Sequence, residues 1–182
     1  KGVSTVERYG TQDQAIPNTF LSDFSTASIT EDFSGNGKLE LNTPQYLKIT
    51  TGSIERALTD YLKISIFTDA MYKADKDGDN TGDVTGTKVS FDIDFIYYDA
   101  SGAHTVRAFQ SGFNGKCGSK YVHTFGIDTE QYQPFTDWEV KVTRVGGDVS
   151  SSGYKVFNNI YCGIIESQIT DKLEYPHSAY VG

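Results

Sequence analysis

The spacing of hydrophobic positions along the chain is typical of β-strands. The clearest case is TKVSFDIDFIYY, residues 87–98, in which every second position from Val89 to Phe95 is a large apolar residue. A period of two residues predicts a strand with one buried face. Further strand-like runs occupy residues 3–10, 27–33, 38–42, 45–52, 61–67, 104–110, 120–127, 137–145 and 154–169.

Segments rich in glycine and polar residues separate these runs and predict turns, as in SGNGK (34–38), DASGAH (99–104) and GGDVSSSG (146–153). Apolar residues at helical spacing occur only in residues 53–63. Short strands without alternating helices predict an all-β fold, an antiparallel β-sandwich of jelly-roll-like or Ig-like type with little helix. We expect residues 1–182 to form a single β-rich domain.

The segment DKDGDNTGD begins like a calcium-binding EF-hand loop. Its candidate ligands, at loop positions 1, 3, 5 and 9, are Asp75, Asp77, Asp79 and Asp83. The turn glycine at position 6 is replaced by Asn80, and Gly86 stands in place of the closing glutamate. Because both flanks are strand-like and Asp, Asn and Gly also favour turns, we expect the tip of a β-hairpin and no metal or cofactor. Bound calcium is the alternative interpretation.

Charge and composition narrow the possible partners. The chain carries 24 acidic and 16 basic residues, a formal charge of −8, with no basic cluster, so a nucleic-acid surface is not expected. No apolar run is long enough for a membrane-spanning helix. Cys117 and Cys162 are too few and too far apart for a disulfide scaffold, and we expect free thiols. The start at Lys1 suggests a fragment of a longer protein.

No catalytic constellation is evident in the sequence. His104, His123 and His177 have none of the spacings of a zinc site. The chain also lacks the G-x-S-x-G nucleophile elbow, the Walker loop and a dinucleotide-binding glycine motif. We therefore expect no enzyme activity and identify no catalytic residue.

Aromatic residues make up 13% of the chain and have two interpretations. They could form a surface that stacks on sugars or binds a protein, for which the candidates are Tyr97, Tyr98, Tyr121, Tyr132 and Trp138. They could equally be cross-strand pairs and core residues of the sheets. The core interpretation is favoured for each single ring, Trp138 included, because it opens the alternating strand WEVKVTRV.

Three stretches together resemble the tail tip attachment protein J family of lambda-like siphophages, also called host specificity proteins. They are VERYGTQDQAIPNTF (6–20), the Asp- and Gly-rich hairpin with its following strand (78–102), and the segment from DWEVKVTRV to the terminal KLEYPHSAYVG (137–182). Their order and spacing fit the family. The resemblance implies a β-rich insertion domain excised from a larger tail hub protein, with no catalytic or cofactor residues.

The function implied by this resemblance is a structural and interaction module of the phage tail tip. Its expected partners are other phage tail proteins and a bacterial surface receptor or glycan, and we expect a trimer in the virion, assembled in the host cytoplasm. In an insertion domain the two chain ends must lie together, which places the segments around Val6 and Val181 side by side. The alternative is a carbohydrate-binding β-sandwich with stacking aromatic residues and structural calcium.

Overall fold

The computed structural model describes residues 7–8, 26–33, 37–49, 56–77, 81–170 and 180–181. The chain divides into two compact units, one made of Lys1–Ala27 with Ile169–Gly182 and the other of Ser28–Gln168. In the first unit, β1 (Glu7–Arg8) pairs antiparallel with β13 (Tyr180–Val181). The expected meeting of the two end segments is confirmed at Glu7, which lies opposite Val181. Val6 itself lies outside the described residues.

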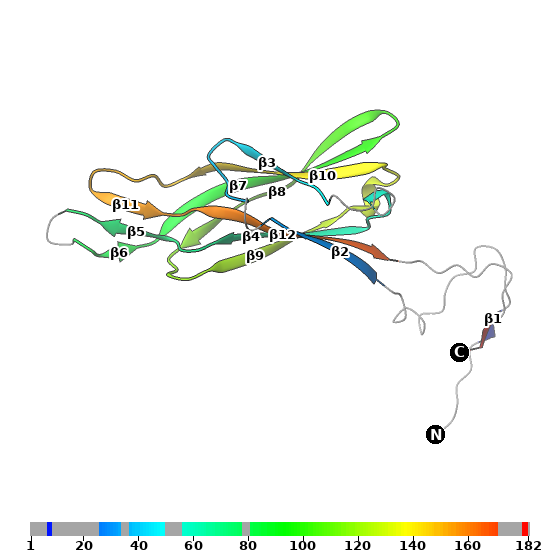
Figure 1. Ribbon diagram of the computed structural model, residues 1–182, viewed down its shortest axis with the longest axis horizontal. Coiled ribbons are helices and arrows are strands. Elements are labelled where there is room, and N and C mark those ends of the chain that lie inside the picture. Colours follow the sequence, from blue (N-terminus) through cyan, green and yellow to red (C-terminus); the bar gives the residue numbers. More distant parts are fainter. Residues whose placement is uncertain are drawn as a thin grey trace, which may run out of the picture. The chain divides into compact units, whose positions relative to one another are not determined.

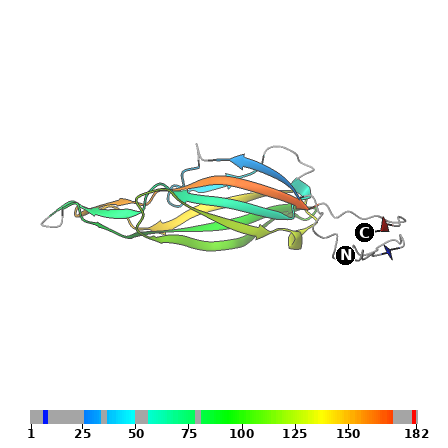
Figure 2. The same cartoon turned by 90° about the horizontal axis from the view of Figure 1, so that it is seen from below.

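The second unit is a sandwich of two four-stranded sheets (Figure 1, Figure 2). One sheet has the order β3-β10-β7-β8 and the other the order β2-β12-β4-β9. The strands are β2 (Thr26–Asp32), β3 (Pro44–Leu47), β4 (Tyr61–Thr68), β7 (Thr87–Asp99), β8 (Gly102–Gly115), β9 (Tyr121–Asp128), β10 (Asp137–Gly147) and β12 (Ile160–Thr170). A third sheet, of order β11-β5-β6, projects from one end of the sandwich (Figure 1) and consists of β5 (Tyr72–Asp75), β6 (Val84–Thr85) and β11 (Tyr154–Phe157).

The strand order distinguishes between the two expected kinds of sandwich. Among the eight sandwich strands the pairing is nested, which means that the two middle strands of the chain pair with each other, then the strands on either side of them, and so on outwards. The pairs are β7 with β8, β4 with β9, β3 with β10 and β2 with β12. Contacts between β10 and β7, and between β12 and β4, then join these pairs into two sheets. Eight strands arranged in this way form a jelly roll, whereas Ig-type sandwiches combine the strand groups ABED and CFG. The fold is therefore the jelly-roll-like alternative.

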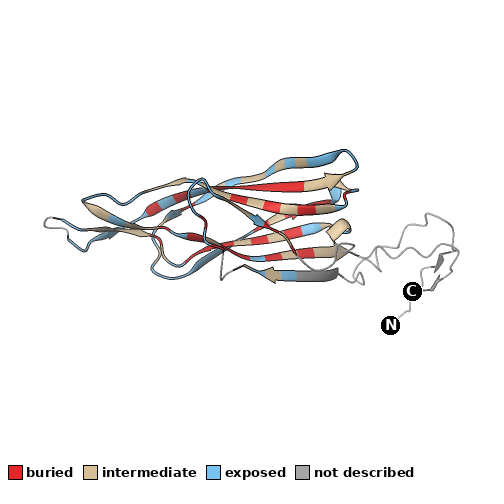
Figure 3. Ribbon diagram, turned by 45° about the horizontal axis from the view of Figure 1, so that its top comes forward, coloured by how far each residue is buried: buried red, intermediate tan, exposed pale blue. Residues whose placement is uncertain are grey.

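The inner faces of the two sheets form a continuous hydrophobic core. The alternation that predicted β7 is confirmed, since Val89, Phe91 and Phe95 are buried. Figure 3 shows that buried residues recur along the strands of the sandwich. Phe91 lies at the centre of the core and meets Phe113 of β8 edge-on at 5.3 Å and Phe125 of β9 at 5.7 Å. Such edge-to-face contacts add to the free energy gained by removing apolar surface from water.

The outer face of β7 is more buried than alternation alone predicts. Asp92 and Asp94 are both buried, although they point away from the core. Arg107 on β8 forms ion pairs with both carboxylates, and Lys141 on β10 lies 3.3 Å from Asp94. Register places both cations directly beside Asp94, so the long side chains cover the acids while neutralising them.

Helical structure in the described residues is brief. Arg56 and Ala57 are helical, and a 3₁₀ turn, η3, spans Glu130–Tyr132. Among the described residues of 53–63 the helical spacing corresponds only to the turn at Arg56 and Ala57, and Tyr61 begins β4, which confirms the strand-like run 61–67. Burial of Leu62 on the inner face of β4 overrides the weak local helix preference. No helix of the described part has the length and apolarity needed to cross a membrane.

Candidate interaction site

The third sheet, which we call the arm, consists of β5 (Tyr72–Asp75), β6 (Val84–Thr85) and β11 (Tyr154–Phe157), together with the loop that joins β5 to β6. The Asp-rich segment is the loop of the β5–β6 hairpin, as expected, with Asp75 N–H donating to the Asp83 carbonyl at 2.9 Å. The two long flanking strands do not form this hairpin themselves, because β4 and β7 lie in different sheets.

The third strand of the arm comes from a run that the sequence suggested was one strand. Residues 154–169 divide at Asn158 and Asn159 into β11, which pairs with β5, and β12, which enters the sandwich. The Asn158 side chain explains this break. Its Nδ2 donates to the carbonyls of Lys88 and Asp148, and its Oδ1 accepts from Arg144 Nη2 at 3.0 Å.

Asp148 anchors the arm to the sandwich. Its Oδ2 accepts from Thr87 Oγ1 at 3.0 Å and from the Lys88 N–H at 3.1 Å, both in β7. The same oxygen lies 3.1 Å from Lys73 Nζ, which belongs to β5. The ammonium of Lys73, followed by these two donors, lowers the pKa of Asp148. One carboxylate therefore joins the arm to the sandwich by charge-assisted hydrogen bonds.

The arm has no core of its own. Every residue of its three strands is partly or fully exposed (Figure 3). One face carries Tyr72 stacked on Phe157 at 4.5 Å, with Lys155 Nζ 4.8 Å from the Phe157 ring. On the other face Lys73 Nζ lies 5.5 Å from the Tyr154 ring. Aromatic surface of this kind, rimmed by charge, is typical of protein contact sites.

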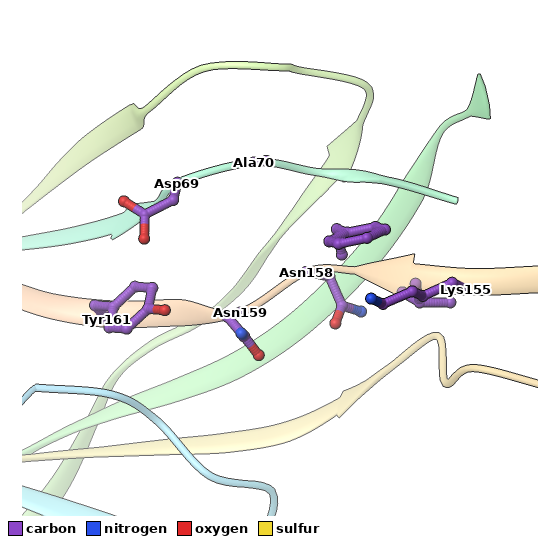
Figure 4. A pocket seen from close by; sticks show the side chains of 8 residues that line it. Asp69, Ala70, Lys155, Asn158, Asn159 and Tyr161 are labelled. Carbon is purple, nitrogen blue, oxygen red and sulfur yellow. The ribbon is translucent and has the colours of Figure 1, made fainter. Parts of the chain in front are cut away.

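A groove of about 360 Å³ lies where the arm meets the sandwich (Figure 4). Asp69, from the β4–β5 connection, lines one side of it, and Asn159 and Tyr161 line the other. Within the described part of the chain, no hydrogen bond or ion pair occupies the polar side-chain atoms of these three residues. No sequence pattern singles out these three residues, apart from the Asn-Asn pair that interrupts a strand-like run.

The aromatic candidates from the sequence do not form one surface. Trp138 is 0% exposed, and its Nε1 donates to Thr59 Oγ1 at 3.0 Å, so the core interpretation is correct and its ring is not available to a ligand. Tyr97 and Tyr132 stack on each other at 5.4 Å and pack against the core. Tyr121 is 46% exposed and lines a separate cavity of about 490 Å³.

Tyr98 is also engaged within the protein. Its hydroxyl donates to Glu139 Oε1 at 2.6 Å, and this hydrogen bond together with burial raises the pKa of Tyr98 to about 12. The phenol is therefore held as a neutral donor between β7 and β10.

Three of the four candidate calcium ligands are among the described residues, and these three lie in the arm. Asp75, Asp77 and Asp83 are at least partly exposed, and Asp79 lies outside the described residues. Among the residues that the structure describes, no group of three or more His, Cys, Asp and Glu side chains could hold a metal ion.

A serine, a histidine and an aspartate meet at the turn between β7 and β8. His104 Nε2 lies 2.9 Å from Ser101 Oγ and 3.0 Å from Asp99 Oδ1. A catalytic triad uses one ring nitrogen for the serine and the other for the carboxylate. Here the same nitrogen faces both groups, and Asp99 also accepts from the Ser101 N–H at 2.7 Å, so the cluster is a hydrogen-bonded turn.

Comparison with known proteins gives one family. The model of the tip attachment protein J, FNIII-A domain, matches residues 39–170. No curated protein matches the chain. A solved chain from Desmodium yellow mottle tymovirus is similar at 12% identity and a TM-score of 0.33, over 90% of this chain and 98% of that one. At that TM-score the likeness bears on neither fold nor function. The family match spans most of the chain and includes the arm, and the chain therefore belongs to the tip attachment protein J, FNIII-A domain family.

Proposed function

We propose that the chain is a non-enzymatic interaction module of a phage tail tip, acting in tail hub assembly and host attachment. Membership of the tip attachment protein J family supports the phage tail tip as the place where the module acts. In this proposal the module is assembled in the host cytoplasm and works in the virion as part of a trimer. The sandwich is its rigid framework, and the arm is the element that contacts neighbouring tail proteins.

The observation that carries this proposal is the arm's exposed apolar surface on a fixed base. A three-stranded sheet with half-exposed aromatic side chains on both faces gains little stability by itself, so a partner surface is the natural means of covering it. The Asp148 and Asn158 hydrogen bonds hold the arm in one orientation before a partner arrives. A preorganised contact loses less conformational entropy on binding.

The path of β12 supports a contact role for the arm, because it separates the arm from the point where the chain leaves this unit. Ile160 pairs with Thr68 beside the arm, and Gln168 pairs with Tyr61 at the opposite end of the sandwich. These positions are roughly 25 Å apart at about 3.3 Å per residue. The second unit therefore presents the arm at one end and its own chain exit at the other (Figure 1).

We also propose that the chain is an insertion domain within a larger hub protein. Pairing of β1 with β13 supports this, because it brings the two ends of the chain side by side. An inserted domain can rejoin its host only when its ends lie close together.

Particle assembly with altered arms tests the proposed function. Val84→Ser and Tyr154→Ser remove apolar surface from the arm and keep Asp148 with its partners Thr87, Lys88 and Lys73, and Leu58→Ser is the matched control because Leu58 is 54% exposed on the sandwich. We expect the arm variants to fold normally as isolated chains but to give fewer complete tails by electron microscopy and weaker adsorption to the host. Normal assembly and adsorption with both arm variants would argue against a contact role for the arm.

A further inference from the structure

We propose that the groove at the base of the arm binds a neutral saccharide. The inference rests on the proposed function for its setting, since a tail tip that attaches to a host meets cell-surface glycans. Its evidence is separate, because it concerns the groove rather than the exposed faces of the arm.

The unengaged polar groups of the groove define the ligand's chemistry. Asp69 offers a carboxylate that only accepts hydrogen bonds, whereas the Asn159 amide and the Tyr161 hydroxyl both donate and accept. A ligand that satisfies all three must donate and accept at closely spaced atoms, and sugar hydroxyl groups do both. An apolar ligand would leave these groups without partners at a considerable desolvation cost.

The charge and shape of the groove favour a neutral, flat ligand. Asp69 on one side and Lys155 on the other balance each other in charge, and Lys155 is directed over the Phe157 ring. Tyr161 stacks on Phe67 at 5.1 Å, which fixes the orientation of its ring in the groove wall. A fixed aromatic wall offers contact area to the apolar face of a sugar ring, and about 360 Å³ lies in the usual range for small-ligand sites.

A peptide added as an extra strand fits this site less well. β11 is the edge strand beside the groove, but two of its main-chain groups on the side away from β5 already have partners. The Val156 N–H donates to Ser150 Oγ at 2.9 Å, and the Tyr154 carbonyl accepts from the Ser151 N–H at 2.9 Å. Addition of a strand requires free main-chain groups at such an edge. The preceding segment of this chain blocks that mode of binding.

The test uses the full 182-residue chain on an array of immobilised bacterial oligosaccharides, followed by titration of any retained sugar with amide chemical-shift mapping by NMR. We expect retention of at least one neutral oligosaccharide, with shifts concentrated at residues 69–71 and 156–161. Asp69→Ala and Asn159→Ala should each weaken binding roughly tenfold or more, because each removes a direct polar contact. Tyr161→Leu should do the same by removing the ring.

Two variants serve as controls. Asp77→Ala removes an exposed carboxylate from the arm loop, and Tyr46→Phe alters an exposed aromatic residue on β3, in the other sheet. Both should bind the sugar like the unaltered chain. Absence of any retained oligosaccharide, or binding that survives all three groove substitutions, would overturn the proposal. So would a tail protein bound at the groove while no sugar binds. None of these results would alter the particle-assembly test of the arm, so the two proposals can fail separately.

Discussion

At the scale of single residues, Trp138 joins the core to a buried polar cluster. Its indole N–H donates to Thr59 Oγ1, which in turn lies 2.8 Å from Ser167 Oγ. We expect Trp138→Phe to lower the free energy of unfolding by about 1 to 3 kcal/mol, through the lost hydrogen bond and the smaller ring. Urea denaturation would measure this, with Tyr46→Phe as the exposed control. A change below about 0.5 kcal/mol would contradict the core role.

Asp99 gives a residue-level prediction about pH. Hydrogen bonds from the Ser101 hydroxyl and N–H, and then from His104, lower the pKa of Asp99 from 3.8 to about 2. Because the pKa of Asp99 is lower in the folded than in the unfolded state, this turn stabilises the fold at pH values above the unfolded-state pKa of 3.8. The stabilisation is lost as the pH falls from 3.8 to about 2. An NMR titration of the carboxyl carbon should show the low pKa, and Ser101→Ala should move it back up. An unchanged midpoint in that variant would refute the assigned cause.

Residue burial could be predicted where alternation alone decides it. Val89, Phe91 and Phe95 were expected inside and are buried. Asp92 and Asp94 show where this reasoning ends, because their burial depends on cations from two neighbouring strands. The identity of those neighbours is a matter of strand register, which a single sequence does not reveal. The groove residues could not be found for the same reason, since Asp69 and Tyr161 meet only through tertiary structure.

At the scale of elements, the long strands were predictable and the arm was not. β4, β7, β9 and β10 are each at least eight residues long, and each includes a stretch in which buried and less buried residues alternate. β5 and β6 are only four and two residues long, and neither has a buried face to impose a period. β5 pairs on its other side with β11, which lies about 80 residues further along the chain, so the local sequence signal is weak.

Asp148 leads to a prediction about the arm as an element. We expect Asp148→Ala to release Lys73 from β7 and to speed amide hydrogen exchange in β5 and β11, with little effect on the core strands of the sandwich. Local opening costs less free energy than global unfolding, so the change should stay within the arm. Asp77→Ala, in the same arm, is the control. Equal protection of the arm in both variants would show that Asp148 does not anchor it.

At the scale of the whole molecule, composition and turn spacing indicated a sandwich but did not determine its strand order. A jelly roll and an Ig-like sandwich draw on the same short amphipathic strands, and they differ only in which strands are neighbours. The family name contains FNIII, whereas the eight sandwich strands of this chain are nested as in a jelly roll. The two descriptions share the antiparallel two-sheet sandwich.

Calcium addition tests whether an ion contributes to the stability of the whole fold. The β5–β6 loop lacks the closing glutamate of an EF-hand, and strands flank it, so we expect added calcium to leave the melting temperature unchanged. Calcium at about 100 times its dissociation constant would stabilise the chain by about 2.7 kcal/mol and raise the melting temperature by roughly 5 to 10 °C. A rise of that size, reversed by a chelator, would show that the loop is a calcium site.

The pairing of the chain ends leads to the last prediction. Glu7 lies directly opposite Val181, and opposed residues in an antiparallel pair have Cα atoms about 4.5 to 5.5 Å apart, within the range that a disulfide spans. We expect Glu7→Cys with Val181→Cys to form a disulfide under mild oxidation.

The experiment needs only one native thiol removed. A Cys117→Ser background suffices, because Cys162 is buried and burial raises the pKa of its thiol to about 12, which keeps it unreactive. Arg8→Cys with Val181→Cys is the matched control, since neighbouring positions on one strand direct their side chains to opposite faces. The control should cross-link far more slowly. Equal rates for the two pairs, or no disulfide in either, would mean that the ends do not hold this register, and the insertion proposal would lose its structural support.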